Sequence, residues 1–187
     1  MPSKSKLPPT VEDTHKRARV RGEAGSDQNQ LRGQLYAAAF DRIKAGLANG
    51  NYFEVILLCD SLIGDRIEAM IQTIKHEDSD QYPTESMGSA LGTLQREAKA
   101  RGVRFDKPTR QFFEQLNKFA SERNVAVHSF VIVNNGNRHL TVEDRLEQVK
   151  KTAEKGAELA REVADRTPSF LNYLKAKLVT PNTSLSS

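Results

Sequence analysis

The sequence predicts an all-α protein, most simply a helical bundle of four to five main helices. Apolar residues recur every three to four positions through the middle of the chain, as they do along one face of an α-helix. No long segment alternates with a period of two, so strands are not expected. Helix stop and start signals, such as Asn49-Gly50 and Gly102, separate the periodic segments.

The periodicity predicts six segments. A first helix, with Leu31, Leu35, Ala38 or Ala39, and Ile43 on one face, ends at Asn49-Gly50. Asp106 and Pro108 indicate the start of a later helix, because the missing N–H of a proline costs little in the first turn. Thr141 and Asp144 resemble a capping box and indicate the start of the next one. The break at residues 134–137 separates two long helices. The expected helices span residues 27–48, 52–75, 84–100, 106–133, 141–166 and, as a short last helix, 168–178.

Length and composition limit the class of protein. The 187 residues correspond to roughly one domain of about 150 residues plus a tail. No apolar run reaches the 18 residues of a membrane span, and the first residues lack the apolar segment of a secretory signal. We therefore expect a cytoplasmic protein that has no membrane partner. One cysteine, Cys59, and four scattered histidines argue against a disulfide, a metal site or a cofactor.

The net charge of +4 is carried by the N-terminal arm. Residues 1–22 hold six Lys or Arg and two Asp or Glu, so the other 165 residues sum to zero. We expect residues 1–26 to be a disordered basic arm, residues 27–178 the domain, and residues 179–187 a flexible tail. Such an arm favours nucleic acid through counterion release, although it is equally consistent with a solubilising tail. The candidate RNA-binding residues of the arm are Lys16, Arg17, Arg19 and Arg21.

Two charged residues interrupt apolar stripes. Asp60 falls within the stripe of the helix at 52–75, which comprises Ile56, Ile63, Ile67, Met70 and Ile74. Arg123 interrupts the stripe of the helix at 106–133, which comprises Phe112, Leu116, Phe119, Val127 and Phe130. A buried carboxylate needs a partner or a proton, so we expect Asp60 and Arg123 to pair. Such a pair can also serve only to fix helix register.

His128 follows Arg123 by five residues, about 140° around the helix. By default, a lone histidine there is a hydrogen-bonded helix residue. Together with Arg123 and Asn124, however, it provides the groups that phosphodiester cleavage needs. Arg stabilises charge on a pentavalent phosphorane, and His transfers a proton near neutral pH. RNA brings its own nucleophile, the 2′-OH, so this chemistry requires no metal.

The segment Arg123-Asn124-Val125-Ala126-Val127-His128 resembles the Arg-x4-6-His motif of HEPN domains. Residues 57–71 also resemble the earlier helix of that family, in which an acidic residue accompanies the motif. The resemblance covers about residues 30–166. It implies a HEPN-like bundle that forms a homodimer and acts as a metal-independent endoribonuclease in a toxin or antiviral defence role.

Carried onto this chain, the resemblance assigns four roles. Arg123 would stabilise the phosphorane, His128 would act as general acid or base, and Asn124 would orient the phosphate. Asp60, or alternatively Asp65, would hold Arg123. In family members paired with a nucleotidyltransferase antitoxin, a modified Tyr commonly stands two residues after the His. In this chain that position is Phe130, so control by that route is not expected, although another antitoxin or a larger defence complex stays open.

Two alternatives to the nuclease stay open. The first is a HEPN-like module that binds RNA or protein in a regulatory role without cutting. The second is an unrelated helical adaptor in which Asp60 and Arg123 form only a buried pair.

Overall fold

A computed structural model of the chain describes residues 27–75 and 86–179. Within these residues the chain forms five α-helices and no strand, which confirms the all-α prediction. The basic arm, with Lys16, Arg17, Arg19 and Arg21, and the segment after residue 179 lie outside the described residues. The helices are α2 (Asp27–Asn49), α3 (Tyr52–Lys75), α4 (Met87–Ala100), α5 (Lys107–Val131) and α6 (Val142–Val179).

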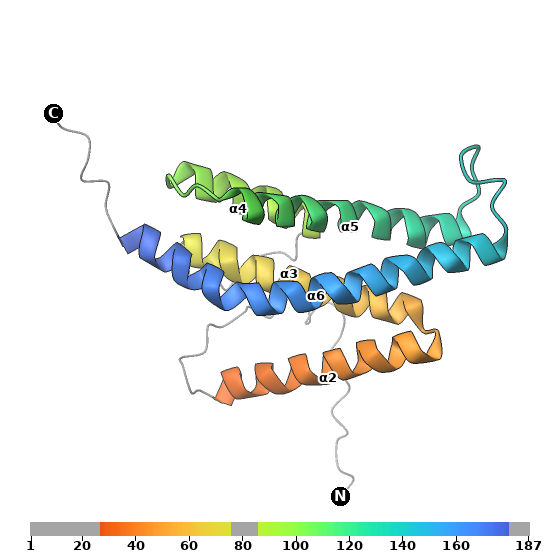
Figure 1. Cartoon of the computed structure of the whole chain (residues 1–187), viewed down its shortest axis with the longest axis horizontal. Coiled ribbons are helices and arrows are strands. Elements are labelled where there is room, and N and C mark those ends of the chain that lie inside the picture. Colours follow the sequence, from red (N-terminus) through yellow and green to blue (C-terminus); the bar gives the residue numbers. More distant parts are fainter. Residues whose placement is uncertain (1–26, 76–85, 180–187) are drawn as a thin grey trace, which may run out of the picture.

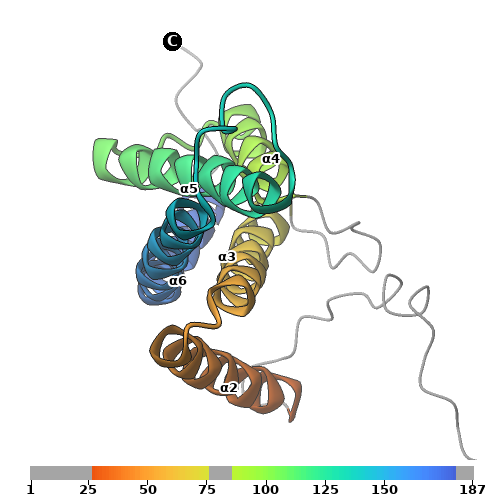
Figure 2. The ribbon, with the colours of Figure 1, turned by 90° about the vertical axis from the view of Figure 1, so that its right-hand side faces the viewer.

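Helices α3 and α6 lie side by side at the centre of the bundle, and the chain runs along both in the same direction (Figure 1). Helices α4 and α5 cover one side of this central pair, and α2 covers the other (Figure 2). The core is therefore built mainly from α3, the most apolar of the helices, whose stripe residues Ile56, Ile63, Ile67, Met70 and Ile74 are all buried as expected. None of the described helices is long and apolar enough to cross a membrane.

Local signals set the helix ends where the sequence places them. Gly50 and Gly102 adopt the left-handed φ values of 77° and 71° that end α2 and α4. The Asp106 carboxylate accepts a hydrogen bond from the Thr109 N–H at 2.9 Å and caps α5. At the start of α6, the Thr141 N–H donates to Asp144 Oδ2 at 2.9 Å, and the Asp144 N–H donates to Thr141 Oγ1 at 3.1 Å. The predicted capping box is confirmed.

The predicted break before Pro168 is wrong, because α6 continues through it to Val179. Proline inside a helix removes one hydrogen bond and costs about 3 kcal/mol. In α6 the buried hydroxyl of Thr167 donates to the Val163 carbonyl at 2.6 Å. Residues on both sides of the proline, Val163 and Leu174, are buried in the core. This burial offsets the proline and keeps the helix continuous.

Two predicted apolar faces differ from the observed ones. In α2, Leu31 and Leu35 are 55% and 62% exposed, whereas Tyr36 and Phe40 pack against the core instead. In the first turns of α6, Val142 and Leu146 are exposed. Helix α2 carries apolar residues on two faces, so periodicity alone does not select the buried one, and at the start of α6 Arg145 is buried instead of Val142 and Leu146.

The two halves of α5 lie in different surroundings. Its first half is covered by the short helix α4, and Phe113 and Ala120 are buried. Its second half runs beyond α4 (Figure 1), and Asn124, His128 and Val131 are exposed. These five residues lie along one side of α5, which is therefore divided into a covered part and an open part.

Candidate functional site

An ion pair of Asp60 and Arg123 joins α3 to α5. An Arg123 Nη1 atom contacts Asp60 Oδ2, and the two side chains are 17% and 26% exposed. The backbones of α3 and α5 approach each other at few positions, so the long arginine side chain spans the gap. The predicted pairing is confirmed.

Burial and the ion pair act in opposite directions on Asp60. Burial raises the pKa of this carboxyl above its usual value of 3.8, and the charge and hydrogen bond of Arg123 partly lower it again. Within the described structure, Asp60 Oδ1 and Arg123 Nε are buried without a hydrogen-bond partner. The pair thus combines one close contact with two buried polar atoms that have no hydrogen-bond partner, which is uncommon in protein interiors.

His128 does not contact this ion pair. Arg123 points toward α3, and His128 lies on the exposed side of α5, as does Asn124. Five residues along an α-helix amount to about 140° of rotation and about 7.5 Å of rise, which accounts for the separation. The structure therefore brings together Asp60 and Arg123 but leaves His128 on an open face of the same protomer.

Apolar side chains surround these polar groups. Phe53 and Phe130 pack edge to face, with ring centroids 5.0 Å apart, at the end of the α3–α5 contact. Leu57 on α3 and Val125 on α5 are exposed, and Val131 is 77% exposed. The open half of α5 is thus a mixed surface, with an imidazole and an amide set among exposed aliphatic side chains.

Asp65, the alternative support for Arg123, lies in a different contact. Its carboxylate accepts a hydrogen bond from the hydroxyl of Tyr36. The guanidinium of Arg66 stacks over the same tyrosine ring at 4.1 Å. Asp65 therefore fastens α2 to α3, and the acidic partner of Arg123 is Asp60.

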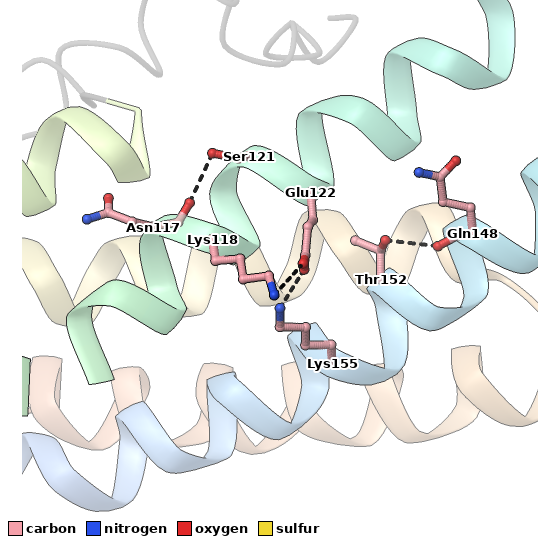
Figure 3. Close-up of polar contacts among 7 residues, drawn as sticks. All are labelled: Asn117, Lys118, Ser121, Glu122, Gln148, Thr152 and Lys155. Atoms are coloured by element: carbon pink, nitrogen blue, oxygen red, sulfur yellow. Dashed lines mark hydrogen bonds and ion pairs between the residues drawn. The ribbon is translucent and has the colours of Figure 1, made fainter. Parts of the chain in front are cut away.

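A second polar cluster, which the sequence does not reveal, joins α5 to α6 (Figure 3). Glu122 contacts Lys155 at 2.5 Å and Lys118 at 3.8 Å, so one carboxylate lies between two ammonium groups. These residues come from different helices, and only Lys118 and Glu122 have the i, i+4 spacing that a sequence makes visible. The cluster borders a groove of about 500 Å³ between the two helices. It fixes the face of α5 adjacent to Arg123.

Arg145 organises the connection between α5 and α6. It is 6% exposed, and its Nη2 atom donates to the Asn137 carbonyl at 2.8 Å. The Asn137 side chain in turn donates to the Ile132 carbonyl at 2.8 Å, directly after the last turn of α5. The sequence does contain a signal for Arg145, because it stands four residues before the buried Val149, at a stripe position.

No group of three or more His, Cys, Asp or Glu side chains is placed to hold a metal ion within residues 27–75 and 86–179. Comparison of the chain with family models, curated proteins and solved structures gives no match. The resemblance to HEPN domains therefore rests on the motif at residues 123–128 and on the accompanying helix.

Proposed function

We propose that this chain is a metal-independent endoribonuclease of HEPN type that works as a homodimer. The observation that carries the proposal is the Asp60–Arg123 pair, which fixes a guanidinium on α5 five residues before an exposed histidine. The residues of the motif are thus held by the fold in two different ways: the arginine is anchored, and the histidine is accessible.

The reaction needs a base, an acid and a cation. The base removes the proton of a ribose 2′-OH, and the 2′ oxygen then forms a bond to the adjacent phosphorus. The bond from phosphorus to the 5′ oxygen of the next nucleotide breaks, and the acid gives that oxygen a proton. The products are a 2′,3′-cyclic phosphate and a 5′-OH. Arg123 stabilises the additional negative charge of the phosphorane, and His128 carries out a proton transfer.

Dimerisation supplies the second proton-transfer group. Helix α5 carries a single histidine, so one protomer presents one imidazole on this face. The neighbouring exposed residues Val125 and Val131 are aliphatic, as expected for a surface that a second copy covers. In a two-fold dimer the same patch meets itself, so the two His128 side chains approach the same cleft.

A non-catalytic module is the second candidate. One observation favours it: the Arg123 side chain is only 17% exposed and already engages Asp60. Such a protein would bind RNA or a partner protein through the open half of α5, and His128 would contribute contact rather than proton transfer.

The experiment is cleavage of a labelled RNA of mixed sequence in EDTA. We compare the wild type with Arg123→Ala and His128→Ala. Matched controls are Arg110→Ala, an exposed arginine on the same helix, and His139→Ala, an exposed histidine in the following loop. Removing a general acid or base typically costs about 10²- to 10⁴-fold in rate. Removing one donor that stabilises transition-state charge costs about 10²- to 10³-fold. We therefore expect losses of at least about 100-fold for both motif variants.

Circular dichroism and thermal unfolding show which variants are folded. Activity that falls only in the two motif variants supports the nuclease. Binding of RNA by a folded wild type that cuts nothing would favour the second candidate. Equal cutting by all five proteins would place the activity outside residues 123–128.

A further inference from the structure

A cavity lies at the opposite end of α5 from His128. It has a volume of about 680 Å³ and is enclosed by the start of α5, the loop before it and the last third of α6. Small-molecule sites typically occupy about 300–1,000 Å³. Thr109, which lines the cavity, is 19 residues before His128, a span of about 28 Å along the helix. The cavity is therefore separate from the proposed nuclease site.

Five aromatic side chains line the cavity. Neighbouring rings pack edge to face, at 5.2 Å between Phe105 and Phe113 and 5.7 Å between Phe113 and Phe170. Phe113 is buried, whereas Phe105 and Phe170 are half-buried and Tyr173 is at the surface, so the cluster extends from the core to the opening. The exposed parts of Phe105, Phe170 and Tyr173 give a further planar group an aromatic surface to pack on.

Four charged residues also line the cavity, and two of them already have partners. Arg166 pairs with Glu162 at 2.6 Å and stacks over the Phe112 ring at 4.7 Å. Asp106 caps α5 through Thr109, which lowers the pKa of its carboxyl.

Arg104 and Asp165 are different. Both are exposed, and neither side chain forms an ion pair within the described residues. The Arg104 backbone carbonyl, in contrast, accepts a hydrogen bond from the Tyr173 hydroxyl at 2.8 Å, which fixes this loop to α6. The cavity thus offers one uncommitted guanidinium and one uncommitted carboxylate beside a wall of rings.

We propose that this cavity binds a nucleoside monophosphate. The base stacks on the aromatic wall, the phosphate pairs with Arg104, and Asp165 accepts hydrogen bonds from the ribose hydroxyls or from an amino group of the base. A purely apolar ligand would leave both charged side chains unused, and an amino acid would fill only a small part of the volume. The proposal does not depend on the nuclease activity, since it concerns binding at another end of the bundle.

The test is calorimetric titration of the full chain with AMP, GMP and adenosine. Ser169 is exposed and lines the cavity, so Ser169→Trp fills the space without disturbing the core. Asn172→Trp places the same side chain on an exposed position of α6 outside the cavity and is the matched control. Arg104→Gln removes the guanidinium.

We expect saturable binding of AMP or GMP to the wild type and to Asn172→Trp, and none to Ser169→Trp. Arg104→Gln should weaken nucleotide binding about tenfold and leave adenosine binding unchanged, because only the phosphate loses its partner. No saturable binding to a folded wild type would overturn the proposal. Binding that survives in Ser169→Trp, or that Arg104→Gln does not weaken, would overturn it as well.

Discussion

A charged side chain alone would be unfavourable at the position of Asp60 or of Arg123. Each residue is tolerated because the other one pairs with it. The sequence shows two charges at apolar stripe positions on two helices, and burial makes an unpaired charge at either position costly. The structure joins them in one ion pair. The same reasoning at Asp65 leaves its partner open, because Asp65 is on the polar side of its helix and its contact with Tyr36 follows only from the packing of α2.

Breaking this pair from one side should destabilise the fold. Asp60→Ala leaves a mostly buried guanidinium without its acceptor, and we expect a loss of about 1–3 kcal/mol in the free energy of unfolding, measured by urea denaturation. The double variant Asp60→Leu with Arg123→Met removes both charges and should recover most of the loss. If the double variant instead lost as much free energy of unfolding as the two single substitutions lose together, the two residues would not interact.

The pH dependence of this pair has a definite sign. Because burial raises the pKa of Asp60, the folded chain holds this proton more tightly than the unfolded chain. Binding of this proton stabilises the folded chain. The stabilisation is fully present below the unfolded pKa near 3.8, and it is lost as the pH rises through the higher pKa of the folded chain. Asp60→Asn does not titrate, so its free energy of unfolding relative to the wild type should increase from pH 3 to pH 7. A relative decrease would mean that Arg123 outweighs burial.

Cys59 provides an independent probe of the core. Burial, with a smaller contribution from Asp60, raises the pKa of its thiol to about 12 against the opposing charge of Arg161. At pH 8 about one thiol in ten thousand would be ionised, and the side chain is fully buried. We expect no reaction of the folded protein with Ellman's reagent at pH 8 and one equivalent of thiol per chain in denaturant. Rapid labelling of the folded chain would contradict the packing of α3 against α6.

Helix α3 and the first half of α5 were the elements most completely predictable, because the apolar stripe residues expected from the sequence are buried in each. Periodicity was insufficient for α2, where Leu31 and Leu35 compete with Tyr36 and Phe40 for the core. It was also insufficient at Pro168, where tertiary burial overrides a strong local break signal. In the candidate site, the Asp60–Arg123 pair could be predicted because two residues of opposite charge interrupt the apolar stripes of two helices. The Glu122–Lys155 contact could not, since both residues have ordinary surface spacing.

Close packing between helices depends on Gly156 of α6. A Cβ atom there would lie 2.8 Å from the Phe119 ring and 3.3 Å from the Cys59 Cβ, so three helices meet at this point. We expect Gly156→Ala to lower the free energy of unfolding by about 1–3 kcal/mol through overpacking. Gly64→Ala on α3 is the control, because no atom lies within 4 Å of its Cβ position. There alanine should stabilise the helix by about 0.5–1 kcal/mol, and equal effects at both sites would argue against the close approach.

The whole molecule is a bundle in which one short helix leaves its neighbour partly uncovered. Helix α4 has 14 residues and α5 has 25, so within the described residues the end of α5 that carries His128 extends beyond the cover of α4. The far end of α5 instead closes an aromatic cavity. Under the two proposals, the uncovered end meets a second copy and becomes the catalytic site, and the cavity end binds a nucleotide.

The dimer gives a prediction for the assembled protein. Val131→Glu places a charge in the exposed aliphatic surface beside His128 and should convert the dimer to monomer in sedimentation velocity, with loss of RNA cleavage. Leu35→Glu makes the same change on the exposed face of α2 and should leave the dimer intact. A wild type that is monomeric at all concentrations, yet cuts RNA, would contradict the composite site.

The most direct measurement compares one labelled RNA with the same sequence carrying a 2′-deoxyribose at every position, each incubated with the wild-type protein in EDTA. Attack by the 2′-OH predicts cutting of the RNA, with 2′,3′-cyclic phosphate ends, and no cutting of the deoxy strand. Equal cutting of both strands, or no cutting of the RNA by a folded dimer, would contradict the proposed attack by the 2′-OH.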